Sequence, residues 1–111
     1  MSKKIIQLST KQCPPCQRLK QEIERIIDKT SYTYEYISLY NGVEINDPSF
    51  TYEQYWDEIN ANIKKYRSDY GVFFTSFPTI LKQEDDKLEL ISTKDIIKML
   101  QNESKWNKRV N

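Results

Sequence analysis

The motif Cys13-Pro14-Pro15-Cys16 contains both cysteines of the chain and lies between two different hydrophobic patterns. Before it, residues 4–8 form a short apolar run of the length of a strand. After it, apolar residues recur every three or four positions, which predicts a helix from about residue 14 to residue 28. The cysteines therefore lie where a strand leads into a helix.

The rest of the chain alternates between the same two patterns and contains no linker or repeat. Strands are expected at residues 33–39, 79–81 and 87–91, and further helices at residues 52–70 and 92–101. Residues 102–111 are either a continuation of the last helix or a frayed tail. The order β-α-β-α-β-β-α over 111 residues predicts a single α/β domain, 1–111.

The composition of the chain excludes several classes of function. The chain has 17 Lys and Arg against 16 Asp and Glu, and a net charge of +1 argues against a nucleic-acid or membrane partner. It contains no His, which excludes Cys–His catalysis, Ser–His–Asp triads and histidine-based metal sites. No apolar run is long enough to cross a bilayer or to form a signal peptide. We therefore expect the protein to lie in the cytoplasm. We also expect it to be a monomer.

The position of the cysteines has a chemical meaning. A thiolate at a helix N-terminus is stabilised by the helix dipole and by free backbone amides. Cys13 is expected just before the helix and exposed, whereas Cys16 lies one turn in on the apolar side. Cys13 is therefore predicted to be the nucleophile and Cys16 the resolving thiol of a redox pair. Half of a zinc site or a chance pairing are the alternatives, but a zinc ion needs further Cys or His ligands, so no metal is expected.

The two prolines affect the same sulfur. Pro14 and Pro15 carry no backbone N–H, so only the N–H of Cys16 remains to donate to Cys13. Fewer donors stabilise the thiolate less, which favours a reducing rather than an oxidising pair. The alternative, compatible with the first, is that the prolines simply begin the helix.

A second motif supports a family resemblance. The segments Tyr70-Gly71-Val72 and Phe77-Pro78-Thr79-Ile80-Leu81-Lys82, together with the strand–Cys-Pro-Pro-Cys–helix unit, resemble the thioredoxin-like superfamily and its small thioredoxin and glutaredoxin members. The resemblance implies a thioredoxin fold, with a central four-stranded mixed sheet and helices on both faces. It also implies a cis peptide bond before Pro78, beside the cysteines, and a backbone contact between Phe77 and substrate. Substrate is expected to meet Phe77, Pro78, Lys11, Pro14 and Pro15.

The resemblance also implies an activity. We expect a thiol–disulfide oxidoreductase that reduces protein disulfides without a bound cofactor and receives electrons from a thioredoxin-reductase-type enzyme or from glutathione. The alternatives are a glutathione-coupled glutaredoxin, or a redox-inactive thioredoxin-fold interaction protein of a phage or virus. The expected location is the cytoplasm of a bacterium, or of a cell infected by a phage or virus. Gln7 occupies the position of the buried acid of thioredoxins and cannot titrate.

Residues 41–77 form a longer segment than the minimal fold requires. The apolar stripe of its helix, from Tyr52 to Tyr70, is predicted to face the core, with a partner surface as the alternative. Phe73, Phe74 and Phe77 precede Pro78 and are expected near the cysteines, either buried or as an apolar patch that grips substrate.

Overall fold

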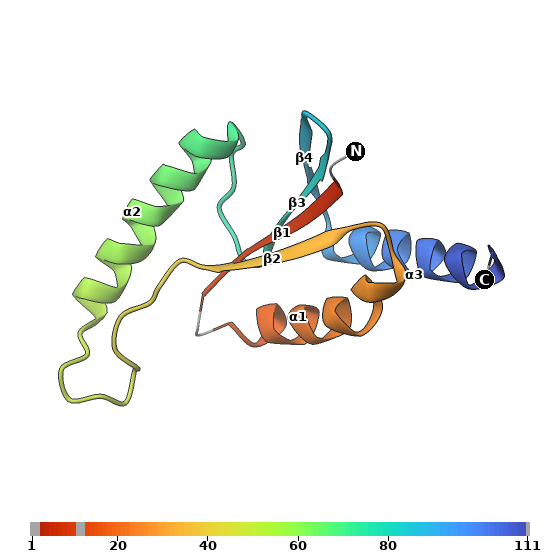
Figure 1. Cartoon of the computed structure of the whole chain (residues 1–111). Coiled ribbons are helices and arrows are strands. Elements are labelled where there is room, and N and C mark those ends of the chain that lie inside the picture. The colour runs from red at the N-terminus through yellow and green to blue at the C-terminus, as the bar shows by residue number, and fades with distance from the viewer. Residues whose placement is uncertain (1–2, 11–12, 111) are drawn as a thin grey trace.

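The computed structural model describes residues 3–10 and 13–110, with side chains as far as residue 105 (Figure 1). Its elements follow the predicted order. They are β1 (Lys3–Ser9), α1 (Pro14–Ile26), a short 3-10 helix (Ile27–Lys29), β2 (Thr33–Ser38), α2 (Tyr52–Tyr70), β3 (Thr79–Glu84), β4 (Lys87–Ile91) and α3 (Thr93–Val110). The third strand is longer than predicted, because it continues to the tight turn at residues 85–86.

The four strands form one mixed sheet in the order β2-β1-β3-β4. β1 pairs with β2 in parallel and with β3 antiparallel, and β3 and β4 form an antiparallel hairpin. β1 has a neighbour on each side and helices over both faces, so it is buried from Ile5 to Ser9, which explains the apolar residues Ile5, Ile6 and Leu8. The predicted four-stranded mixed sheet is confirmed.

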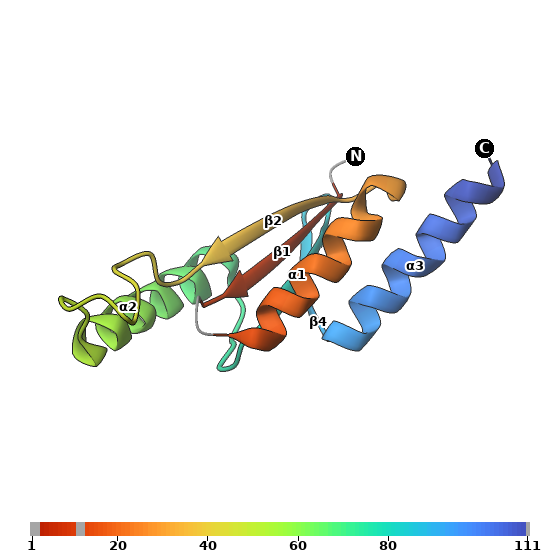
Figure 2. The same ribbon diagram turned by 90° about the horizontal axis from the view of Figure 1, so that it is seen from below.

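Helices cover both faces, as predicted. α1 and α3 lie side by side on one face (Figure 2), where Ile5 and Ile80 of the sheet pack with Ile23 of α1 and Leu100 of α3. Alternate residues of β1 point to the opposite face, where Ile6 and Leu8 pack with the carboxyl-terminal half of α2. The two clusters are the cores on either side of the sheet.

Helix α2 has clear signals at both ends. The Thr51 hydroxyl accepts a hydrogen bond from the N–H of Gln54 (3.2 Å) and caps the first turn. Gly71 ends the helix in the left-handed conformation, with φ of 66°. Thr51 is therefore the N-cap residue of α2.

The prediction that the α2 stripe faces the core is only partly correct. Tyr55 and Ile59 are buried, but Tyr52 and Trp56 remain 62% and 53% exposed. Figure 1 gives the reason, because the first turns of α2 extend beyond the end of the sheet. Tyr52 and Trp56 belong to the apolar stripe that the spacing predicts, but no strand lies opposite them.

Helix α3 is longer than predicted and α1 is shorter. The Ser92 hydroxyl accepts from the N–H of Asp95 (3.1 Å) and caps α3, which continues past Gln101 to Val110. Of the two alternatives for the last segment, helix continuation is therefore correct up to Val110. Within the described ranges, no helix combines the length and the apolar character that crossing a bilayer requires.

Candidate redox site

The two cysteines are joined at the start of α1. Their sulfurs form a disulfide, and their Cα atoms lie 5.2 Å apart. Cys13 is the N-cap residue of α1, and Pro14 and Pro15 occupy its first two positions. The Cys13 sulfur accepts from the backbone N–H of Cys16 (3.2 Å), as the loss of the two proline donors predicts. Among the described residues, one backbone N–H donates to this sulfur, whereas a helix without prolines in its first turn offers more.

Cys13 is less exposed than the sequence suggested. Its relative exposure is 9%, and that of Cys16 is 0%. The prediction of an exposed Cys13 is wrong because its sulfur is bonded to the buried Cys16 and folds back over the amino end of the helix. The small exposed part of Cys13 faces a groove, so an attacking or leaving sulfur must approach from that side.

A buried hydrogen-bond network lies behind the cysteines. The Gln7 side chain is completely buried, and its amide nitrogen donates to the carbonyl of Cys16 (2.9 Å) and to the hydroxyl of Ser9 (2.9 Å). Its amide oxygen accepts from the hydroxyl of Tyr34 (2.5 Å). Gln7 thus links the first turn of α1 to strands β1 and β2 and fixes the backbone around Cys16.

Tyr34 is a permanent donor in this network. Burial raises the pKa of its hydroxyl well above the usual value, and the charges of Glu24 and Tyr36 raise it further. The hydroxyl therefore keeps its proton at physiological pH and holds Gln7 in one orientation. Neither side chain takes or gives a proton there, so the network positions the cysteine pair without titrating.

The Phe77–Pro78 peptide bond is cis, as the family resemblance implies. Pro78 immediately precedes β3, and its neighbour Thr79 pairs with Leu8 near the end of β1 that leads to the cysteines. Phe77 lines the same groove as Cys13, Pro14 and Pro15. The structure thus brings together three of the expected substrate contacts, Pro14, Pro15 and Phe77, and places Pro78 next to Phe77. Lys11 lies outside the described residues.

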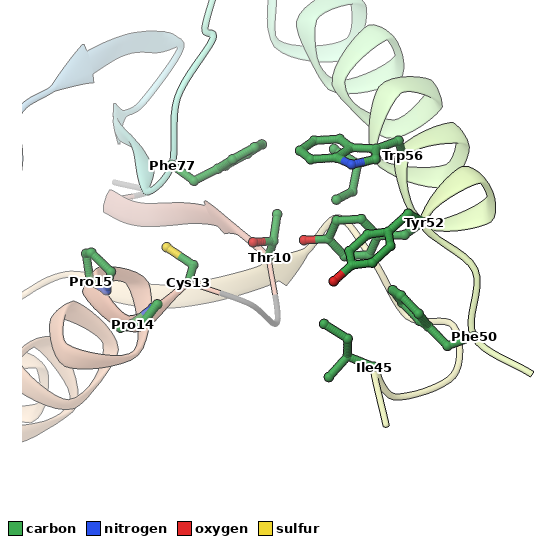
Figure 3. Close-up of a pocket in the computed structure, with 11 residues that line it drawn as sticks. Thr10, Cys13, Pro14, Pro15, Ile45, Phe50, Tyr52, Trp56 and Phe77 are labelled. Carbon is green, nitrogen blue, oxygen red and sulfur yellow. The ribbon is translucent and has the colours of Figure 1, made fainter. Parts of the chain in front are cut away.

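The opposite wall of the groove comes from the long segment after β2. Figure 3 shows Cys13 and Phe77 on one side and the rings of Phe50, Tyr52 and Trp56 on the other. The groove has a volume of about 520 Å³ and is open to solvent. Its remaining lining residues are Thr10, Ile45, Tyr55 and Ile59. We call this feature the aromatic groove.

Sequence reasoning identified the wall that contains Cys13, but for the α2 stripe it offered a partner surface only as the alternative to the core. The spacing of Tyr52 and Trp56 predicts the core side of a helix, and no pattern singles out Ile45 or Phe50. One signal was available, since residues 40–63 contain five acidic residues and no Lys or Arg. Elsewhere in the chain, Lys and Arg are interspersed with Asp and Glu.

The three phenylalanines before Pro78 have different environments. Phe74 is buried, Phe77 lines the aromatic groove, and Phe73 is 71% exposed with its ring 4.2 Å from the Arg67 guanidinium carbon. Burial is therefore correct for Phe74, while the expectation of a patch that grips substrate stays a prediction for Phe77. No group of three or more His, Cys, Asp or Glu side chains capable of holding a metal ion occurs among the residues that the structure describes.

Comparison by sequence gives no match, either among protein-family models or among curated proteins. Comparison by structure gives several. The germline-specific thioredoxin Deadhead from Drosophila melanogaster matches with a TM-score of 0.56 and 11% identity, over 91% of this chain and 80% of that one. The thioredoxin of Plasmodium falciparum matches with a TM-score of 0.52 and 15% identity, over 92% and 71% of the two chains.

A third match is tryparedoxin I from Leishmania major, with a TM-score of 0.52 and 18% identity, over 92% of this chain and 76% of that one. Identities this low establish the fold and nothing finer. The chain has the thioredoxin fold, as the sequence resemblance implies. Activity must be argued from the site itself.

Proposed function

We propose that this protein is a thiol–disulfide oxidoreductase that reduces protein disulfides through Cys13 and Cys16. The observation that carries the proposal is the placement of a disulfide-forming pair at the amino end of α1, with one sulfur facing an open groove. A helix N-terminus stabilises the thiolate that performs exchange. The thioredoxin fold supports the same chemistry by analogy.

The reaction begins from the reduced pair. The Cys13 thiolate attacks one sulfur of a substrate disulfide, so that a Cys13–substrate disulfide forms and the first substrate thiolate leaves and is protonated by water. The Cys16 thiol loses its proton to solvent, because Gln7 cannot accept one, and its thiolate attacks the Cys13 sulfur. The second substrate thiolate leaves, and the Cys13–Cys16 disulfide remains. Two electrons have passed from the pair to the substrate, and the proton that Cys16 releases to solvent balances the proton that the first substrate thiolate takes from water.

The other expected site residues have roles around this exchange. Phe77 and Pro78 shape the wall on which an extended substrate segment lies, and Pro14 and Pro15 keep the number of donors to Cys13 low. We infer a reducing pair that transfers electrons to substrates, with a potential of about −230 to −270 mV. We also propose that the protein works as a monomer in the cytoplasm, where such a pair is kept reduced.

Insulin reduction tests the proposal. Wild-type protein with dithiothreitol should accelerate the precipitation of insulin chains, and Cys13→Ser should show only the rate of dithiothreitol alone. Cys16→Ser should accumulate a mixed disulfide with insulin on Cys13, which mass spectrometry detects under non-reducing conditions. If wild type is no faster than Cys13→Ser, the protein is not a disulfide reductase, and the redox-inactive interaction protein becomes the better interpretation.

The electron donor separates the two enzyme alternatives. We favour a thioredoxin-reductase-type donor over glutathione, because the described residues that line the aromatic groove include no Lys or Arg to pair with the carboxylates of glutathione. Reduction that runs with a thioredoxin reductase and NADPH supports this preference. Reduction that requires glutathione and glutathione reductase identifies a glutaredoxin instead.

A further inference from the structure

The aromatic groove has a property that disulfide exchange alone does not explain. Two of its large rings, Tyr52 and Trp56, remain mostly exposed although the chain has a core on each face of the sheet. Exposed apolar surface next to a reactive group is characteristic of a binding site. The Cys13 sulfur forms part of the opposite wall, so whatever occupies the groove lies beside the exchanging sulfur.

Contacts between the rings order the aromatic wall. The Phe50 and Tyr52 rings meet edge to face with centroids 5.1 Å apart, and the Tyr55 and Trp56 rings do the same at 5.2 Å. Such contacts hold the rings in place and reduce the conformational entropy that a ligand must offset on binding. A preformed aromatic wall binds another ring or a large aliphatic side chain well.

The loop before α2 is fixed to the same wall. The Tyr40 hydroxyl donates to the carbonyl of Val43 (2.5 Å), and the Tyr40 ring packs against Phe50 and Tyr55. Gly42 lies so close to this ring that a Cβ atom there would come within 2.7 Å of the Tyr40 hydroxyl oxygen. The loop is therefore held in one position against the aromatic wall of the groove.

Charge adds a second preference. Asp47, Glu53 and Asp57 are exposed on the loop and on the first turns of α2, and Glu53 and Asp57 directly follow the groove residues Tyr52 and Trp56 in the chain. Hydrogen bonds from the backbone and hydroxyl of Ser49 lower the pKa of the Asp47 carboxyl, so it stays ionised. Residues 40–63 contain no Lys or Arg to neutralise these groups. The rim of the groove therefore attracts a cationic partner.

We propose that the aromatic groove binds an aromatic or large aliphatic side chain adjacent to the reactive cysteine of a peptide substrate, and that its acidic rim favours lysine or arginine nearby in that peptide. This inference rests on the proposed function, because the exchanging sulfur fixes where the substrate lies. It defines the substrate class as basic, aromatic-flanked protein disulfides. A groove of about 520 Å³ falls within the usual range of ligand sites, roughly 300–1,000 Å³, and accommodates one large side chain with its neighbours.

Four cyclic disulfide peptides provide the test. They share one ring and differ only in the residues that flank the two cysteines, which are tryptophan or serine combined with lysine or glutamate. Pre-reduced protein is mixed with each peptide, and the rate constant for peptide reduction is measured by acid quenching, alkylation and mass spectrometry. Rates with dithiothreitol correct for the intrinsic reactivity of each ring.

The tryptophan peptides should be reduced about tenfold faster than the serine peptides, the factor that one well-packed aromatic contact provides. Trp56→Ala and Tyr52→Ala, made singly so that a folding defect in one leaves the other informative, should each reduce this ratio to about three or below. Phe73→Ala is the matched control, because Phe73 is an exposed aromatic that packs on Arg67 and does not line the groove. It should leave the ratio unchanged.

The charge preference has its own pair of variants. Lysine peptides should react several-fold faster than glutamate peptides at low salt, and the difference should shrink as salt screens the rim. Combining Glu53→Gln with Asp57→Asn should remove most of the difference. The control combines Glu22→Gln with Asp28→Asn, which neutralises two exposed carboxylates of α1 and the following turn. It should have no comparable effect.

The outcomes separate this inference from the proposed function. If all four peptides are reduced at equal corrected rates, and Cys13→Ser reduces none, the inference is overturned while the proposed function stands. The inference is also overturned if Phe73→Ala lowers the tryptophan preference as much as Trp56→Ala. If no peptide is reduced faster than by Cys13→Ser, the proposed function fails and the substrate class fails with it.

Discussion

On one face of the sheet, α1 and α3 enclose a cluster in which Ile23, Ile96 and Leu100 have no exposed surface. On the other face, α2 covers the sheet with only its carboxyl-terminal half. Its amino-terminal half packs on the loop after β2, in a separate cluster built around Tyr40, and leaves two aromatic rings exposed. The two helical layers have similar apolar spacing in the sequence but very different burial.

This difference in burial suggests separate roles, with the α1–α3 cluster contributing to stability and the first half of α2 to binding. The residues of the α1–α3 cluster do not line the groove, whereas the first half of α2 extends past the sheet and brings aromatic rings opposite Cys13. Substitutions on the two sides should therefore change different measurements. Those on the closed face should change the free energy of unfolding, and those on the open side should change the rate with particular substrates.

The largest expected effect contrasts these two sides directly. Leu100→Ala, within the α1–α3 cluster, should lower the free energy of unfolding by about 2–5 kcal/mol, because it removes a fully buried side chain. Trp56→Ala should lower it by about 1 kcal/mol or less, because the ring is half exposed. Guanidinium unfolding of the disulfide-bonded protein measures both. Equal losses would show that the aromatic groove is part of the core.

A smaller loss in the free energy of unfolding is expected at Gln7, whose side chain contacts the backbone of Cys16. Gln7→Leu should destabilise the protein by about 1–3 kcal/mol, because the buried hydroxyl of Tyr34 loses its acceptor. The double variant with Tyr34→Phe should recover part of that loss, since both partners are then absent. A double-mutant cycle by chemical unfolding gives the coupling between the two side chains. Strict additivity would contradict a direct hydrogen bond.

Gly71→Ala should cost about 1 kcal/mol in the free energy of unfolding. The residue adopts φ of 66°, which an L-residue with a Cβ atom disfavours, and an added Cβ would meet no atom within 4 Å. The loss is therefore one of backbone conformation alone. Gly71→Asn serves as the control and should cost less, because Asn tolerates this conformation. Thermal unfolding of the three proteins checks the order.

The smallest effect is a dependence on pH at the far end of the closed face. The Tyr32 hydroxyl donates to Glu84, and this bond, with the nearby Lys82, lowers the pKa of the Glu84 carboxyl. Its stabilising contribution is complete above the usual pKa of a glutamate and is lost as the pH falls through the lowered value.

Tyr32→Phe should therefore be less stable than wild type at pH 7, and the gap should narrow towards pH 3 as Glu84 is protonated. Urea unfolding at several pH values measures the gap, and peptide reduction should be unaffected. A gap that widens in acid would mean that Glu84 is not the acceptor that matters.

Periodicity alone predicted the order of all strands and helices, because local spacing reflects which side of each element is covered. The cysteine motif between strand and helix located the redox pair, and the cis Phe77–Pro78 bond followed from the family resemblance. These features depend on short stretches of sequence that carry their own signals.

The remaining features depend on residues far apart in the sequence. Spacing places Tyr52 and Trp56 on the inner side of α2 but cannot show that the sheet ends before it reaches them. The contact between Gln7 and Tyr34 requires the parallel register of β1 and β2, in which Ile5 lies opposite Tyr34. The burial of Cys13 depends on how its sulfur folds back over the helix, which no sequence pattern encodes.

The register of the sheet also determines where the segment between β2 and β3 leaves and returns. Ser38 at the end of β2 lies opposite Ser9, and Thr79 at the start of β3 lies opposite Leu8, so the chain leaves and re-enters the sheet at the same end. Lengthening a segment between two fixed points is inexpensive, at roughly 0.6 kcal/mol for each doubling. Residues 41–59 pair with no strand of the sheet, so a change of length there should alter what faces the Cys13 sulfur and leave the register of the strands unchanged.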